Sequence, residues 1–384
     1  MKAAAVFAVF AVFALFVTGF AVAAEPAGRY VSLQQEMRQA IARGNAWLKS
    51  QQKEDGHWDD DGLPAFTALA LTAAAQDPST KDSGHVVKGY DWLMQQQKED
   101  GGIYNRGLST YNTATSITAL VAANKTEFEP AIVRARKHLI GQQWDRGEKG
   151  KTDQPGDGGV GYGAGTDKDH DDLSNTYLAI EALALSKKVV EDGKHGDQPD
   201  LDWQAAVTFL SRCQNRSESN DQPWVTDDPK NKGGFIYSPT SAKSEETLPD
   251  GRKALRSCGS MSYAGLLSLV YAQLPPEDPR VVAVKDWLGK NYTVSENPGL
   301  GDQGLYYYYH AMPKALAAAN LSTLKLADGT EADWRKDLGE KLLSLQQPDG
   351  SWKNANGRWM ESNPVLVTAY VVLALEQIDR SIPK

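Results

Sequence analysis

The sequence predicts an all-α protein, folded as a single (α/α)6 toroid with one outer and one inner helix in each of six pairs. Two observations favour this fold. A motif with glutamine, glycine and an aromatic residue recurs, in full or degenerate form, six times between residues 30 and 380. A helix rich in alanine and other small residues follows each copy. Units that repeat in this way stack on their neighbours and bury a continuous core.

Residues 1–24 are expected to lie outside this fold. A positive start at Lys2 precedes a long uncharged run, which closes with small residues just before Glu25. This is the pattern of a signal peptide, and it predicts a secreted or periplasmic protein. The run is also long enough to span a bilayer, so an uncleaved anchor is the alternative. No second run of that length follows, so we expect no transmembrane segment after signal removal.

The outer helices end at the recurring motif, which is complete over 52–58 and 346–352. Glycine suits the left-handed backbone that follows a helix end. The glutamine side chain can satisfy carbonyls that the helix end leaves free, and the aromatic ring can cover them. The motif therefore indicates stability and not chemistry.

The inner helices are predicted from their alanine content and from the Thr or Ser that opens most of them, which can cap a first turn. Alanine lets neighbouring helices approach closely. We expect inner helices at Phe66 to Gln76, Thr113 to Asn124, Ser174 to Ser186, Ser260 to Leu274, Tyr309 to Asn320 and Val367 to Ile378.

The motif from Gln52 to Trp58, with its second intact copy, resembles the QW repeat of squalene–hopene cyclases and related terpene cyclases. The α–α toroid of protein prenyltransferase β subunits is similar. The resemblance covers about residues 30 to 380 and implies a six-pair toroid. It implies a small apolar or isoprenoid-like partner, although this toroid serves several chemistries. The formal charge of −8 argues against a nucleic-acid partner.

An acidic cluster before the third inner helix is the first catalytic hypothesis. Asp169, Asp171 and Asp172 complete a D-x-D-D pattern, which resembles the motif whose middle acid protonates an alkene in class II terpene cyclases. Like charges in such a cluster keep one acid protonated. In the family's register, however, the position of the acid holds Ser174. Two other interpretations remain open: Asp172 caps the helix, or alternate aspartates bind calcium.

Cys258, at the start of the fourth inner helix, is the candidate metal ligand. It matches the position of the zinc-binding cysteine in prenyltransferases, with His310 as the candidate histidine, but Arg256 stands where that family has an aspartate ligand. Zinc is therefore one possibility, and no cofactor is certain. A disulfide between Cys213 and Cys258 and a free buried thiol are the others. The disulfide would join the end of the outer helix to the start of the inner helix in one unit, at the same end of the toroid, in an exported protein.

A run of four tyrosines before His310 is the candidate cavity wall. Tyr306, Tyr307 and His310, together with Tyr263 and Trp359, could line a pocket for an apolar or sugar-like ligand. Glu361 and Asn363 could join its rim, and core packing explains the tyrosines equally well.

Three functions follow from these patterns. The first is an exported protein that binds or transforms an isoprenoid-like molecule in its central cavity, as a cyclase-like isomerase or a prenyltransferase-like enzyme if it is catalytic. The second is a binding or scaffold protein that has lost the ancestral chemistry. The third is a carbohydrate-active toroid that uses paired carboxylates.

Overall fold

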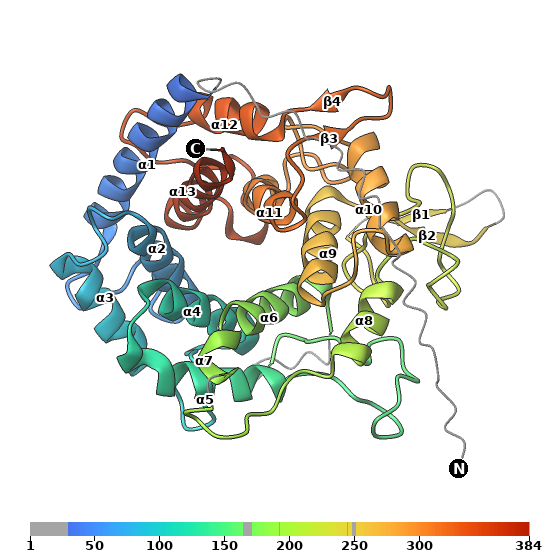
Figure 1. Ribbon diagram of the computed structural model, residues 1–384, viewed down its shortest axis with the longest axis horizontal. Coiled ribbons are helices and arrows are strands. Elements are labelled where there is room, and N and C mark those ends of the chain that lie inside the picture. The colour runs from blue at the N-terminus through green and yellow to red at the C-terminus, as the bar shows by residue number, and fades with distance from the viewer. Residues whose placement is uncertain (1–29, 164–170, 192, 244, 248–250, 384) are drawn as a thin grey trace, which may run out of the picture.

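The computed structural model describes residues 30–163, 171–191, 193–243, 245–247 and 251–383. The helices form two concentric rings around a common axis (Figure 1). The inner ring consists of α2 (Pro64–Gln76), α4 (Ser109–Ala123), α6 (Leu173–Leu185), α9 (Gly259–Tyr271), α11 (Leu305–Ala318) and α13 (Pro364–Ser381). The outer ring consists of α1 (Val31–Gln51), α3 (Gly84–Gln95), α5 (Glu129–Ile140), α8 (Trp203–Arg212), α10 (Pro279–Lys290) and α12 (Trp334–Ser344). The predicted (α/α)6 toroid is confirmed.

The ring is closed by contact between its first and last units. Each inner helix packs on the next in chain order, and α13 packs on α2 as well as on α1. The inner helices are enclosed on nearly all sides; in α2, every residue from Pro64 to Ala74 is buried. Helices that are apolar on all faces are expected at such positions, whereas the outer helices keep a charged face toward solvent.

In five of the six units the recurring glutamine joins its unit to the next one, which differs from the predicted role at the end of its own helix; the fifth unit has Asn291 instead, which bonds to Trp287 O in its own helix. Gln52 Nε2 donates to Gly56 O in its own loop and to His85 O in the next outer helix, both at 2.8 Å. Gln346 Nε2 donates in the same way to Ala40 O, at 2.9 Å, and so links the sixth unit to the first. The same pair of bonds recurs at Gln97, Gln143 and Gln214.

The motif glycine is required because its backbone touches the next outer helix. Gly56 has a φ of +111°, and a Cβ there would lie 2.5 Å from Lys88 O. Gly350 has a φ of +95°, and a Cβ there would lie 2.7 Å from Arg43 O. Any side chain at these positions would meet both a strained backbone and a neighbouring carbonyl.

The threonine that opens an inner helix ties that helix to the motif loop instead of capping a first turn. Thr67 Oγ1 accepts the backbone N–H of Trp58 at 2.9 Å, while the indole N–H of Trp58 donates to Leu48 O. The same bond to the aromatic position, or to its equivalent, is made by Thr113, Thr176, Ser262 and Thr368.

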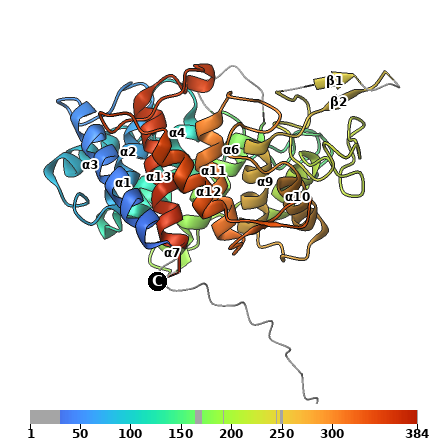
Figure 2. The same cartoon turned by 90° about the horizontal axis from the view of Figure 1, so that it is seen from above.

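The remaining elements are short and belong to neither ring. β1 (Glu245–Thr247) and β2 (Lys253–Leu255) pair antiparallel, with Glu245 opposite Leu255, and project from one side of the ring (Figure 2). The other short elements are β3 (Leu324–Lys325), paired with β4 (Glu331–Ala332), together with α7 (Lys187–Glu191), η1 (Thr126–Phe128) and η2 (Arg358–Met360).

No helix within the described ranges is long and apolar enough to cross a bilayer. The predicted leader, residues 1–24, lies outside those ranges.

Candidate functional site

Two cavities lie inside the inner ring among the residues that the structure describes. The large cavity, of about 400 Å³, lies toward the C-terminal ends of the inner helices. Leucine, threonine and tyrosine side chains make up most of its wall, and Arg380 lies at its edge. The small cavity, of about 140 Å³, lies toward the N-terminal ends of the inner helices, near Ser174, Ser260 and Glu361.

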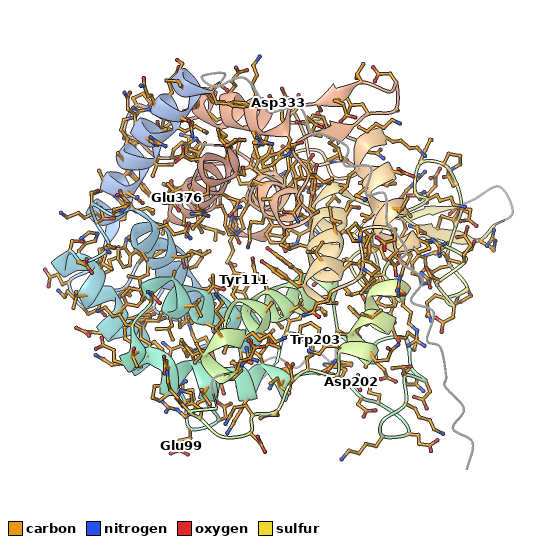
Figure 3. The ribbon with its side chains drawn as sticks, in the orientation of Figure 1. Glu99, Tyr111, Asp202, Trp203, Asp333 and Glu376 are labelled. Atoms are coloured by element: carbon orange, nitrogen blue, oxygen red, sulfur yellow. The ribbon has the colours of Figure 1, made fainter. Side chains whose placement is uncertain are left out.

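Three tyrosines line both cavities and form the partition between them. This tyrosine layer consists of Tyr111, Tyr307 and Tyr370, from α4, α11 and α13. The Tyr111 and Tyr370 hydroxyls lie 3.0 Å apart, and the Tyr307 and Tyr370 rings meet edge to face. The Tyr307 hydroxyl lies 3.2 Å from Ser174 Oγ, so the layer reaches from α4 round to α6. Figure 3 shows Tyr111 at the inner wall of the ring.

Besides Arg380 at its edge, the mainly apolar wall of the large cavity contains a charge cluster around Lys314. Lys314 Nζ donates to Glu181 Oε2 at 2.6 Å and to the Tyr177 hydroxyl at 2.8 Å, and lies 3.4 Å from His310 Nε2. Burial lowers the pKa of His310 well below its usual value, and the Lys314 charge adds to this. The cluster is therefore neutral overall: one ammonium, one carboxylate and a neutral imidazole.

The small cavity contains a carboxyl group that caps a helix from another unit. Glu361 accepts the backbone N–H groups of Tyr306 and Tyr307, at 3.2 and 2.7 Å, and the side-chain amide of Asn354 at 2.7 Å. Burial raises the pKa of Glu361, although these three hydrogen bonds favour its ionised form. Glu361 thus supplies the N-terminal cap that Gly304, the N-cap residue of α11, lacks.

Of the three predicted catalytic aspartates, the structure places Asp172 at a helix cap. Its carboxylate accepts the backbone N–H of Asn175 at 2.9 Å and the Asn175 side-chain amide at 2.7 Å. Asp172 is the N-cap of α6, which is the capping alternative considered above. Asp171 is buried against Gly156 and is not among the residues that line the two cavities. Asp169 lies outside the described residues.

The predicted disulfide is not formed: Cys213 and Cys258 are both buried free thiols. The short segment from Phe235 to Ile236 runs between them. Ile236 N donates to Cys213 O on one side, and Cys258 N donates to Phe235 O on the other. Two successive strand spacings separate the two backbones by about 9–10 Å, whereas a bridge needs Cα atoms within about 7 Å.

The two proposed zinc ligands are not brought together. His310 lines the large cavity and stacks on Tyr370, whereas Cys258 lies at the N-cap of α9 with its sulfur 4.0 Å from Ser260 Oγ. Burial raises the pKa of the Cys258 thiol, which disfavours the thiolate that zinc requires. Within the described part of the chain, no group of three or more His, Cys, Asp or Glu residues is placed to hold a metal ion.

Three of the five predicted cavity residues line a cavity. Tyr307 and His310 line the large cavity, and Tyr307 and Trp359 line the small one. The prediction is wrong for Tyr263 and Tyr306, because both are buried in the core against other tyrosine rings. On α11 the face toward the axis follows positions 307, 310 and 314, so Tyr306 points elsewhere.

Sequence reasoning missed the residues that give the cavities their polar character. They are Tyr111, Tyr177, Glu181, Lys243, Lys314 and Tyr370. The spacing of four residues between Tyr177 and Glu181, and again between His310 and Lys314, could have shown that each pair shares a helix face. No periodic pattern locates Lys243, which lies in an irregular loop.

Comparisons with known proteins identify the fold. No known family profile matches the sequence, and no curated protein matches it significantly. The type II terpene cyclase MstE from Scytonema is similar in structure, with 13% identity and a TM-score of 0.51 over 91% of this chain and 99% of the cyclase. A variant of that cyclase, solved with its substrate geranylgeranyl dihydroxybenzoate, has 14% identity and a TM-score of 0.52 over the same shares.

A family 76 glycoside hydrolase from a bovine Bacteroides thetaiotaomicron strain is also similar, with 10% identity and a TM-score of 0.57 over 90% of this chain and 78% of the hydrolase. At these identities the likeness concerns the fold. The chain has an α–α toroid fold, as the sequence predicted, and this fold is common to the terpene cyclase and the glycoside hydrolase.

Proposed function

We propose that the protein is an exported toroid that binds an uncharged, isoprenoid-like molecule in its large cavity without cyclising it by protonation. The large cavity itself is the observation that supports this proposal most directly. Its volume of about 400 Å³ falls in the range of small-molecule sites, which are mainly apolar and have a few polar groups. Because the cluster around Lys314 is neutral overall, the cavity favours an uncharged ligand over a charged one.

The absence of a proton donor at the expected place supports binding over cyclisation. In the register of class II cyclases, the position of the acid holds Ser174, whose hydroxyl lies 3.2 Å from that of Tyr307. An aliphatic hydroxyl is too weak an acid to protonate an alkene. Asp172, the nearest described carboxylate in the sequence, is engaged by Asn175 as a helix cap.

The similarity in fold to a terpene cyclase supports an isoprenoid-like ligand. In the Scytonema cyclase, the same toroid is solved with a substrate that carries a geranylgeranyl chain. A wall of tyrosine and leucine suits such a chain because both burial of apolar surface and contact with aromatic rings contribute.

A calorimetric titration of the protein with geranylgeraniol tests the binding proposal. Leu178 is half-buried in the cavity wall, so we expect Leu178→Trp to fill the cavity and weaken binding by at least about tenfold, or about 1.4 kcal/mol. Val282→Trp, on the exposed face of α10, is the matched control and should bind normally. Binding that is absent in the native protein, or unchanged by Leu178→Trp, would overturn the proposal.

Two further measurements test the rest of the proposal. Incubation with squalene and geranylgeraniol should return both unchanged, and a cyclic isomer in the extract would disprove the non-catalytic part. A glycan array should give no binding; a specific glycan would favour the carbohydrate function instead.

Export is tested separately by sequencing the N-terminus of the protein recovered from each cell fraction. We expect a mature protein that starts at Glu25 in the periplasmic or secreted fraction. An intact leader on protein found in the cytoplasm would contradict this.

A further inference from the structure

The ammonium group of Lys243 lies between two aromatic rings at the small cavity. Its Nζ is 4.2 Å from the centre of the Tyr237 ring and 4.1 Å from that of Trp359. Within the described part of the chain, no hydrogen bond or ion pair is formed by this ammonium. Burial lowers the pKa of Lys243, as expected for an ammonium that has lost water.

The backbone that presents Trp359 is strained. Trp359 and Met360 have φ values of +52° and +65°, in the left-handed region that bulky residues rarely adopt. Such a conformation costs about 1–2 kcal/mol per residue, and observed strain of this kind often marks a ligand site. Both side chains are also exposed, although both are large and apolar. The Trp359 ring packs on Gly304 but remains 37% exposed, so its burial is incomplete at a position where the backbone is strained.

We propose that Tyr237 and Trp359 form an aromatic cage for a quaternary ammonium group, which Lys243 occupies when no ligand is bound. Aromatic cages bind quaternary ammonium groups through the electron-rich faces of their rings. A lysine ammonium is strongly hydrated in water, so it loses more hydration free energy in the cage than an N-methylated ammonium does. An N-methylated cation is therefore the better occupant, and Lys243 needs only to rotate its side chain outward.

The charges around the cage suit a cation. Glu361 lines the small cavity, and the Asp172 charge acts favourably on the ammonium of Lys243. Arg358 lies against Trp359, 5.1 Å from its ring centre, and opposes a further positive charge. Because Lys243 leaves when the ligand enters, the net charge at the cage is unchanged. This site is independent of the isoprenoid proposal, since the tyrosine layer separates it from the large cavity.

Calorimetric titration with tetramethylammonium chloride tests the cage, with sodium chloride as the control for ionic strength. Lys243→Ala removes the internal competitor, and we expect it to tighten binding by about tenfold or more. Lys253→Ala is the matched control, because Lys253 is an exposed lysine on the adjacent hairpin, paired with Glu245 at 3.0 Å. It should bind like the native protein.

Trp359→Leu should abolish binding of tetramethylammonium, and Tyr237→Leu replaces it as the test variant if Trp359→Leu unfolds. Binding that is absent even in Lys243→Ala, or unaffected by loss of either ring, would overturn the proposal. The two proposals fail separately: Lys243→Ala should leave geranylgeraniol binding unchanged, and Leu178→Trp should leave tetramethylammonium binding unchanged.

Discussion

The hydroxyl groups of Tyr111 and Tyr370 lie 3.0 Å apart inside the ring, although α4 and α13, which carry them, are separated by α2. Together with Tyr307 they divide the central space into a large and a small cavity. The division limits the length of any molecule that the large cavity can hold. It also places polar hydroxyl groups in the middle of a mainly apolar space.

Tyr111→Ala should merge the two cavities. The protein would then accept a longer chain, so we expect the ratio of affinities for squalene and geranylgeraniol to rise in favour of squalene. Competition binding with the two probes measures this ratio. Tyr111→Phe keeps the ring and removes only the hydroxyl contact, and should leave the ratio as it is. An equal ratio in all three proteins would show that the layer does not limit chain length.

Glu376→Gln should stabilise the protein, by an amount that grows with pH. Glu376 lies on α13, next to α1 and α2 (Figure 3), and neither of its carboxyl oxygens has a hydrogen-bond partner among the described residues. Burial raises the pKa of Glu376 well above its usual value of 4.5; Arg380 opposes this and Asp77 adds to it. Above pH 4.5 the unfolded chain loses this proton while the folded protein keeps it, so stability falls as pH rises toward the folded pKa.

The loss is about 1.4 kcal/mol per pH unit at most, and glutamine, which does not ionise, avoids it. Urea unfolding between pH 5 and 8 measures the difference between the two proteins. Glu340→Gln, an exposed glutamate on α12, is the control and should show no such trend. A constant difference across this range would mean that Glu376 is ionised in the folded protein.

Lys314→Met should destabilise the protein strongly. It would leave Glu181, whose side chain is 4% exposed, without its 2.6 Å ion pair. Loss of one partner from a buried pair costs about 3–5 kcal/mol. Replacing both residues, in Lys314→Met with Glu181→Leu, should recover most of that loss. A double-mutant cycle of unfolding free energies measures the coupling, and additive losses would contradict a direct pair.

Gln346→Ala tests the closure of the ring. It removes the hydrogen bonds to Ala40 O and Gly350 O, which join the last unit to the first, and leaves two carbonyls without this donor. We expect a loss of about 1–3 kcal/mol in unfolding free energy. The neighbouring Gln347 bonds only within its own loop through its side chain, so Gln347→Ala should have the smaller effect. If both variants lose the same unfolding free energy, the hydrogen bond between the last and first units does not account for the effect of Gln346→Ala.

Both cysteines should react with an alkylating reagent as free thiols once the protein is unfolded. Denaturation without a reducing agent, followed by alkylation and mass measurement, should add two labels per chain. In the folded protein we expect slow labelling, because both thiols are buried and burial raises their pKa. Recovery of a linked peptide with both cysteines would mean that the Phe235–Ile236 segment does not separate them in solution.

The repeat could be predicted from the sequence because the same motif recurs in every unit, in full or degenerate form. Six weak copies of one motif agree on helix positions, and the glycine and aromatic positions have direct structural reasons, as at Gly56 and Trp58. The site has no such redundancy. Whether Tyr306 or Tyr307 faces the axis depends on about 100° of helix rotation, which a run of four tyrosines does not fix.

Contacts between residues of different units could not be predicted from the sequence either. Lys243 meets Trp359, more than a hundred positions later, and Glu361 caps the start of α11. The predicted disulfide failed for the same reason: two cysteines at one end of a unit are close in the pattern, but the inserted loop runs between them.

The bond from Gln346 to Ala40 has a consequence for the order of the chain. The first helix packs on the last, and Gln34 Nε2 near the start of α1 donates to Asp379 Oδ1 near the end of α13 at 3.2 Å, so the described ends of the chain are neighbours. A chain joined at these ends and opened between two other units would make the same contacts around the ring, which is the condition for a circular permutant to fold. The six units therefore have a cyclic order without a structural first member.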